Sequence, residues 1–287
     1  MILLVEARFT FDGDDRVATS QAQYQVRALS RALDLLNAFS LAQPELSLSA
    51  IAASTHLAPS TALRLLAILV DYGLVEKSAE TDRYRIGVRL FELGSIYIQA
   101  TSIEAEALPL MQTLARECHQ TANLGILDRG EVVHLAVVPP ERPIRFYARV
   151  GQRESAHCTG LGKALLAGLS DGELEQLVAQ RGLTSRTDRT IVTIAALRAH
   201  LAGVRAQGVA LDNEEAEVGL KCVAAPIHDD RNRTIAAVSI SGPVAEFSEQ
   251  MLPTYVQAVK QAAYDISARL GNGVQRGAPA ALDGAER

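Results

Sequence analysis

The feature that most constrains the fold of this sequence is a pair of helical patterns joined by a short turn. The first pattern, in LSLSAIAASTHL, offers Ser47 or Ser49 as its N-cap, and the second begins at Pro59, a residue suited to the first turn of a helix. On a helical wheel the second pattern gathers its apolar residues on one side. The other side, near the helix start, carries Ser60, Thr61 and Arg64.

The flanking residues place this pair of helices in a larger unit. Residues 26–39 have the apolar spacing of a helix, and residues 74–86 alternate around a charged tip, as a β-hairpin does. This order of elements is that of a winged helix-turn-helix; the alternative is a helical hairpin in an all-α core, with its polar residues facing water. In the winged interpretation Ser60 and Thr61 bind phosphate or base edges, Arg64 reaches guanine in the major groove, and Arg83 lies near the minor groove or the phosphates.

Charge limits how such a unit can bind DNA. The whole chain has a formal net charge of −5, and residues 24–95 contain seven Lys/Arg and seven Asp/Glu. Any affinity for nucleic acid therefore depends on a local arrangement of side chains and not on bulk charge.

Composition indicates a globular protein with two domains. The chain has 287 residues, of which 48% are hydrophobic and 21% charged, enough to bury a substantial core. No apolar run has the length of a membrane span, and the N-terminus does not resemble a signal peptide, so we expect a cytoplasmic protein without membrane contact. The three cysteines are widely spaced, which indicates neither a disulfide framework nor a structural zinc site: Cys118, Cys158 and Cys222.

The rest of the chain predicts a linker and an α+β domain. Helical patterns at 89–99 and 105–119 are followed by the β-rich runs ANLGILD, EVVHLAVV and IRFYARV. Helices are expected at 162–169, 171–180, 194–207 and 248–270, with the strands KCVAAPIHD and TIAAVSISGP before the last of them. The predicted organisation is a disordered extension (1–23), a winged helix-turn-helix (24–87), a linker helix (88–104), an effector domain (105–270) and a disordered tail (271–287).

Two stretches of the second domain could carry chemistry. HCTGLGKALLAGL opens a helix with glycines, but it departs from the phosphate-loop pattern at His157 and Ala164. Either its backbone N–H groups after Gly160 bind a carboxylate, or the glycines serve close packing. Acids around Asp212 precede Cys222, yet they lack metal-ligand spacing, and a Cys-His-Asp site is disfavoured because Cys158 and its neighbour would face opposite ways on a strand.

The segment SLSAIAASTHLAPSTALRLLAILVDYGLVEKSAETDRYRIGVRLFELG resembles the DNA-binding domain of the IclR family of bacterial transcriptional regulators. The recognition helix of that family reads Ser-Thr-x-x-Arg-Leu-Leu, which Ser60, Thr61 and Arg64 match here. At the position after Ala62, often occupied by a groove-reaching side chain in the family, this sequence has Leu63. The residues expected to contact DNA are Ser60, Thr61, Arg64, Arg83 and Arg85.

The second domain is similar to the IclR effector domain, whose fold resembles GAF sensor domains. The matching patterns are HCTGLGKALLA, from His157, and GVALDNEEAEVGLKCVAAPI, from Gly208. The resemblance implies a pocket for a small organic or aromatic acid, with no metal and no cofactor. The effector-binding residues that it implies are Thr159, Gly160, Leu161, Asp212, Cys222, Ala224, Ser239 and Ser241.

We therefore expect a ligand-responsive regulator, a repressor by preference, that binds a palindromic double-stranded operator and is not an enzyme. It is expected to act as a homodimer or a dimer of dimers, joined through the first domain and the linker. Because the Asp212 carboxylate would repel an anion, the ligand is expected to carry a hydroxyl or keto group beside its carboxylate, with Lys163 or a backbone donor offsetting the repulsion. The alternatives are a hydrolase that uses Cys158 or Cys222, and a DNA-bridging protein without a ligand.

Overall fold

The computed structural model describes residues 27–101, 103–141 and 148–271. Contacts within the chain divide it into two compact units, Met1–Tyr97 and Ile98–Arg287. The extension predicted at 1–23 and the tail predicted at 271–287 lie outside the described residues, apart from Gly271, and so does most of the strand predicted at 144–150. Within the described residues no single helix is both long and apolar enough to cross a membrane, and only the bent pair Leu48–Ser54 and Pro59–Asp71 together reaches the required length and composition.

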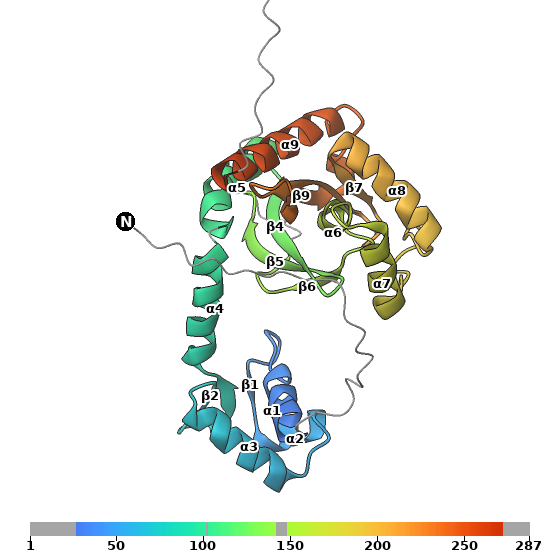
Figure 1. Ribbon diagram of the computed structural model, residues 1–287. Helices are drawn as coiled ribbons and strands as arrows, with labels where there is room; N and C mark the ends of the chain where they lie inside the picture. Colours follow the sequence, from blue (N-terminus) through green and yellow to red (C-terminus); the bar gives the residue numbers. More distant parts are fainter. Residues whose placement is uncertain (1–26, 102, 142–147, 272–287) are drawn as a thin grey trace, which may run out of the picture. The chain divides into compact units, whose positions relative to one another are not determined.

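The first unit contains the elements of a winged helix-turn-helix in the predicted order (Figure 1). Its elements are α1 (Arg27–Asn37), β1 (Glu45–Leu46), α2 (Leu48–Ser54), α3 (Pro59–Asp71), β2 (Val75–Lys77), β3 (Tyr84–Ile86) and most of α4 (Val88–Thr101). The three strands form an antiparallel sheet in the order β1-β3-β2, so the hairpin gains a third strand that the sequence pattern did not reveal.

Local capping explains the abrupt turn between α2 and α3. The Ser47 side chain caps α2 by accepting from the N–H of Ala50 at 3.2 Å. Pro59 occupies the first turn of α3, where a backbone N–H has no intrahelical acceptor. The two helices are bent by 108° at this turn, an angle typical of helix-turn-helix units.

The core of this unit is small, and much apolar surface stays outside it. Its buried residues include Leu35 of α1, Ile51 of α2 and Leu66 of α3. On α1, by contrast, Leu29 and Leu33 are 60% and 51% exposed. The apolar spacing of residues 26–39 thus predicted the helix correctly, but part of that spacing does not serve the core of its own chain.

The second unit is a six-stranded antiparallel sheet in the order β6-β5-β4-β9-β8-β7. In chain order its elements are α5 (Ile103–Cys118), β4 (Thr121–Asp128), β5 (Glu131–Val138), β6 (Arg153–Ser155), α6 (Gly160–Leu166), α7 (Asp171–Arg181), α8 (Ile194–Gln207), β7 (Ala210–Asn213), β8 (Leu220–His228), β9 (Thr234–Pro243), a 3-10 turn (Val244–Glu246) and α9 (Leu252–Arg269). The α6 helix begins earlier than predicted, because Thr159 caps it by accepting from the N–H of Gly162 at 3.1 Å.

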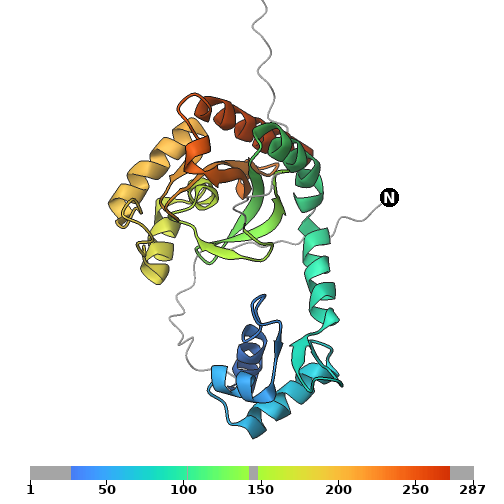
Figure 2. The ribbon, with the colours of Figure 1, turned by 180° about the vertical axis from the view of Figure 1, so that it is seen from behind.

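Helices cover both faces of this sheet (Figures 1 and 2). Side chains alternate along β8, so Val223 and Ala225 pack in the core that contains α5 and α9, whereas Cys222 and Ala224 pack in the core that contains α6, α7 and α8. The same alternation on β4 and β9 directs a set of polar side chains to the α6 face. These polar residues form the cavity described next.

Candidate functional site

The start of α3 presents polar side chains that are free to bind a partner. Ser60 and Arg64 are exposed and Thr61 is half-buried, while Ala62 and Leu66 on the opposite face lie in the core. Ala58 is the N-cap of α3 and has no side chain with which to cap it. Within the described part of the chain, the side chains of the three polar residues have no hydrogen-bond or ionic partner.

The wing contains one free arginine and one engaged arginine. Arg83 is exposed beside the hairpin turn, and its backbone carbonyl accepts from the N–H of Ser78 at 2.8 Å. Arg85 instead donates to the Glu76 carboxylate from Nε at 3.0 Å and from Nη2 at 2.9 Å. This contact lowers the pKa of Glu76. The guanidinium of Arg85 thus joins β3 to β2 through an exposed ion pair, and its contact with DNA stays a prediction.

A cavity of about 470 Å³ lies in the second unit, at the start of α6. Seven of the eight residues expected to bind an effector line it: Thr159, Gly160, Leu161, Asp212, Cys222, Ser239 and Ser241. They come from segments far apart in the sequence, and strand register explains how they meet. Ser241 pairs with Cys222, and Cys222 pairs with Asp212, so one row of residues crosses three strands. In the next row Ser239 pairs with Asn123.

Ala224 is the exception, and its expected role is corrected. It is fully buried and does not line the cavity, although it pairs with Ser239. The start of α6 covers it: a Cβ atom on Gly160 would lie 3.5 Å from the Ala224 Cβ and 2.7 Å from the Cys222 Sγ. Gly160 is therefore required here for close packing of α6 on β8. Gly160 also lines the cavity. Its role in packing therefore does not exclude a contact between its backbone and a ligand.

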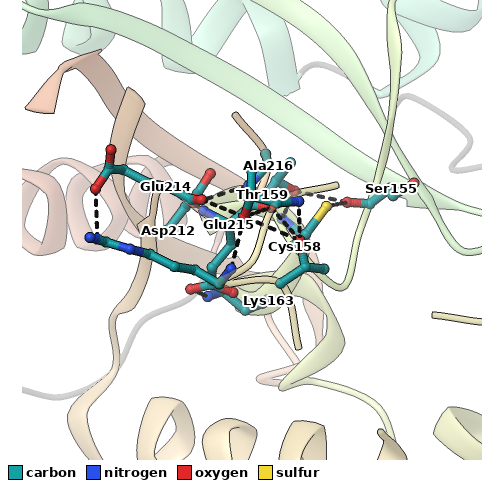
Figure 3. Close-up of polar contacts among 12 residues, drawn as sticks. Ser155, Cys158, Thr159, Lys163, Asp212, Glu214, Glu215 and Ala216 are labelled. Atoms are coloured by element: carbon teal, nitrogen blue, oxygen red, sulfur yellow. Dashed lines mark hydrogen bonds and ion pairs between the residues drawn. The ribbon is translucent and has the colours of Figure 1, made fainter. Parts of the chain in front are cut away.

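Asp212 is a buried carboxyl group at the edge of the cavity (Figure 3). Its Oδ1 accepts from the N–H of Glu215 at 2.7 Å and from the N–H of Ala216 at 3.4 Å. Burial raises the pKa of Asp212 to about 7, and the hydrogen bond from Glu215 only partly opposes this rise. Near neutral pH the group is consequently able either to donate or to accept a hydrogen bond.

Lys163 does not reach the cavity. Its side chain is fully buried and its Nζ forms an ion pair with Oε1 of Glu215, which is also buried (Figure 3). The carbonyl of Glu215 accepts from the hydroxyl of Thr190 at 2.7 Å. The expectation that Lys163 offsets repulsion between a bound anion and Asp212 by contact is corrected: Lys163 anchors α6 to the turn that follows Asp212.

The geometry disfavours a cysteine nucleophile. Residues 156–158 form a turn and not the strand that we expected, and the ring Nε2 of His157 lies 3.0 Å from the carbonyl of Thr184, away from the cavity. Burial raises the pKa of Cys158 to about 11 and that of Cys222 to about 12. Both thiols are thus protonated near neutral pH, whereas the thiolate is the nucleophilic form. Among the described residues no cluster of three or more His, Cys, Asp or Glu could hold a metal ion.

Comparison with known families identifies both units. The family model "IclR helix-turn-helix domain" matches residues 28–79, and "Bacterial transcriptional regulator IclR C-terminal" matches residues 95–268. The chain belongs to the IclR family of transcriptional regulators. It is accordingly a DNA-binding regulator with an effector domain at its C-terminal side, in a family that is not enzymatic, as the sequence predicted.

Individual relatives cover nearly the whole chain. The HTH-type transcriptional regulator BhcR of Paracoccus denitrificans is 36% identical over 84% of this chain and 86% of its own length. The transcriptional repressor IclR of Escherichia coli is 32% identical over 89% of this chain and 94% of its own. A solved IclR homologue from Microbacterium hydrocarbonoxydans, complexed with 4-hydroxybenzoate, superposes with a TM-score of 0.75 at 26% identity, over 85% of this chain and 98% of that one.

The cavity of this IclR-family regulator also contains residues that sequence reasoning missed. Asn123, His134 and Arg186 line it. A signal existed for the first two, because each is a polar residue inside an apolar strand pattern, in ANLGILD and EVVHLAVV. Nothing in the pattern around Arg186 indicates a site, since this residue reaches the cavity from the segment between α7 and α8.

Proposed function

We propose that this regulator represses transcription from a palindromic operator that it binds as a homodimer, and that a small carboxylic acid bound in the cavity controls its affinity for that DNA. The observation that carries the proposal is the pairing of a free polar helix start on α3 with a built cavity in the second unit. The protein would act in the cytoplasm, where its operator is.

The proposed DNA interface consists of Ser60, Thr61, Arg64 and Arg83. A helix of this kind binds in the major groove with its N-terminal residues at the base edges, and an arginine there makes a bidentate contact to guanine. Arg83, on the hairpin of the wing, is proposed to bind phosphate or the minor groove. Arg85 is proposed as a weaker contact because Glu76 already occupies its guanidinium.

A second copy of the chain would cover the exposed apolar side chains of the first unit. Besides Leu29 and Leu33 on α1, Phe91 on α4 is 74% exposed and Val88 is 62% exposed. Large exposed apolar side chains of this kind are typical of interaction surfaces. A twofold dimer also doubles the DNA contacts of a unit whose charge is balanced, and two recognition helices then meet half-sites about one helical turn apart. A dimer of dimers is compatible with the same interface.

Two named relatives support repression as the direction of regulation and a carboxylic acid as the class of ligand. The Escherichia coli relative is named a repressor, and the Microbacterium homologue was solved with an aromatic carboxylic acid. In this chain the start of α6 also lines the cavity, through Thr159, Gly160 and Leu161. A carboxylate is therefore a reasonable class of effector.

The test begins with selection of the operator from random DNA, followed by fluorescence anisotropy with the selected duplex. A thermal-shift screen of carboxylic acids then identifies ligands, because a ligand at 100 times its Kd stabilises the fold by about 2.7 kcal/mol. We expect a stabilising acid to release the DNA. Ser241→Tyr, which adds bulk to the cavity wall at a half-buried position, should bind the operator as the parent does and lose the response to the acid. A dimer or larger species is expected by sedimentation, and a monomer that protects a full palindrome would contradict the proposal.

A further inference from the structure

The outward face of α3 carries apolar side chains beside its polar start. Leu63 is 46% exposed and Ile68 is 53% exposed, and Ala67 is exposed on the same side of the helix. The core of the first unit is filled from the opposite face, by Ala62, Leu66 and Leu69. Leu63 therefore presents much of its side chain to solvent, on a helix of the domain that binds DNA.

Leu63 lies next to the side chains proposed to bind DNA. An α-helix has 3.6 residues per turn, so Leu63 lies nearly one turn after Ser60 and about 100° around the helix axis from Arg64. Between Leu63 and Arg64 the outward face carries only the small side chains of Ser60 and Ala67. Leu63 and Arg64 are thus the longest exposed side chains in the first two turns of α3.

The far end of the same face is acidic. Asp71, the last residue of α3, is exposed and lies about three turns beyond Ser60. A carboxylate at that end repels DNA phosphates, whereas the free N–H groups and positive dipole of the helix start attract them. The start of α3 is accordingly the part that suits the major groove, and Leu63 would then reach the base edges together with Arg64.

The major groove contains one apolar partner for such a side chain. Thymine is the base that presents a methyl group there, on its C5 atom. The side chain of Leu63 has no hydrogen-bond donor or acceptor, so against any other base edge it would displace water from polar atoms without replacing the lost hydrogen bonds. Against a thymine methyl group the same contact buries apolar surface on both sides, which is favourable.

We infer that Leu63 is a specificity-determining residue that packs against the 5-methyl group of a thymine in each operator half-site, near the guanine that Arg64 binds. The inference rests on the proposed DNA interface of α3, and it adds to that interface a base that is selected without a hydrogen bond. It gives a role to the position at which this recognition helix departs from the pattern of its family.

The experiment removes single methyl groups from the DNA. Each thymine in one half-site of the selected operator is replaced in turn by uracil, which keeps the base pair and lacks only the 5-methyl group. Fluorescence anisotropy with the full-length protein gives the Kd of each duplex. We expect a thymine at which uracil weakens binding by about threefold to tenfold, the usual contribution of one buried methyl group.

Protein variants then connect that methyl group to one side chain. Leu63→Ala should bind the parent operator about tenfold to a hundredfold more weakly, because both half-sites lose the contact, and uracil at the sensitive position should cause little further loss. The matched control is Ile68→Ala, which removes a similarly exposed apolar side chain about 140° around the axis of the same helix. It should keep the full loss on uracil substitution. Circular dichroism melts establish that both variants fold as the parent does.

Three results would overturn the inference. They are a selected half-site without thymine, unchanged binding at every uracil substitution, and the same uracil loss in Leu63→Ala as in the parent. A shift of Leu63→Ala toward monomers in sedimentation, with the uracil loss retained, would overturn it as well and would place Leu63 at a contact between copies of the chain.

Arg64→Ala separates this inference from the proposed interface on which it rests. If Arg64→Ala binds the operator as the parent does, the proposed interface on α3 is wrong. If Arg64→Ala loses binding while uracil has no effect on the parent, the interface stands and the role given to Leu63 is wrong.

Discussion

On α3, Ser60 and Arg64 come from the first turns of one helix, whereas in the cavity Asp212, Cys222 and Ser241 come from three different strands. The α3 side chains are exposed and without partners, and the residues around Asp212 are buried in a network of hydrogen bonds and an ion pair. A change on α3 should therefore alter DNA binding alone. A change near Asp212 should alter stability and ligand binding together, because the same contacts serve both.

The largest expected effect tests the buried side of this comparison. Lys163→Met leaves Glu215 buried without its cation, which typically lowers the free energy of unfolding by about 3–5 kcal/mol. The double variant Lys163→Met with Glu215→Leu removes both charges and should recover most of that loss. Urea unfolding followed by circular dichroism measures both. A single variant as stable as the parent would show that this ion pair does not hold α6 to the turn.

The next effect tests the exposed side. Arg64→Ala should lose about 1–3 kcal/mol of binding free energy for the selected operator, the usual contribution of a bidentate contact to guanine, with little change for random DNA. Because the residue is exposed, the melting temperature should match that of the parent. Fluorescence anisotropy with the two duplexes measures the difference. Equal losses on both duplexes would mean that Arg64 contacts phosphate.

A pH series sharpens the comparison at Asp212. The folded-state pKa of this carboxyl is raised to about 7 from an ordinary value of 3.8, so between these values the folded state keeps a proton that the unfolded state has lost. The contribution of Asp212 to the free energy of unfolding therefore falls as pH rises, by at most about 1.4 kcal/mol per pH unit. Urea unfolding of the parent minus that of Asp212→Asn, between pH 4 and pH 7, isolates this slope. The same slope in both proteins would contradict the assignment.

The smallest effects concern the wing. Arg83→Ala should weaken binding to all DNA and reduce the slope of log affinity against log salt by about one unit. Arg85→Ala is its matched control on the same hairpin and should change the salt slope less, because its guanidinium is already bound to Glu76. Anisotropy titrations at several salt concentrations give both slopes. A larger change for Arg85→Ala would make that residue the main DNA contact of the wing.

The two regions also differ in how far the sequence predicted them. Pro59, the cap before α2 and the polar start of α3 act within a few residues of one another, so local patterns were enough to predict the helix-turn-helix. The β1 strand of the wing was missed because its two residues pair with β3, far along the chain. Leu29 and Leu33 have helical spacing, but no local rule states whether a partner chain or the core covers them.

For the cavity, motifs located α6, Asp212 and Cys222, whereas the register of six strands decided which neighbours they have. Ala224 shows the limit: its position in the motif suggested a ligand contact, and the close packing of Gly160 removes it from the wall. Arg186 shows the converse, since it reaches the cavity through hydrogen bonds to the turn after Asp212 that no periodicity encodes. Lys163 follows the glycines of the motif, yet burial pairs it with Glu215 and not with a ligand.

The close approach of Gly160 to Cys222 limits which positions of the cavity wall can vary over evolution. At this end of the cavity a single added methyl group would collide with the sulfur of β8, so variation there disturbs the packing of a helix. Asn123 and His134, which also line the cavity, come from strands β4 and β5 and not from a helix. Substitutions that change ligand specificity are thus expected at the strand positions of the wall, while the wall at the start of α6 stays the same.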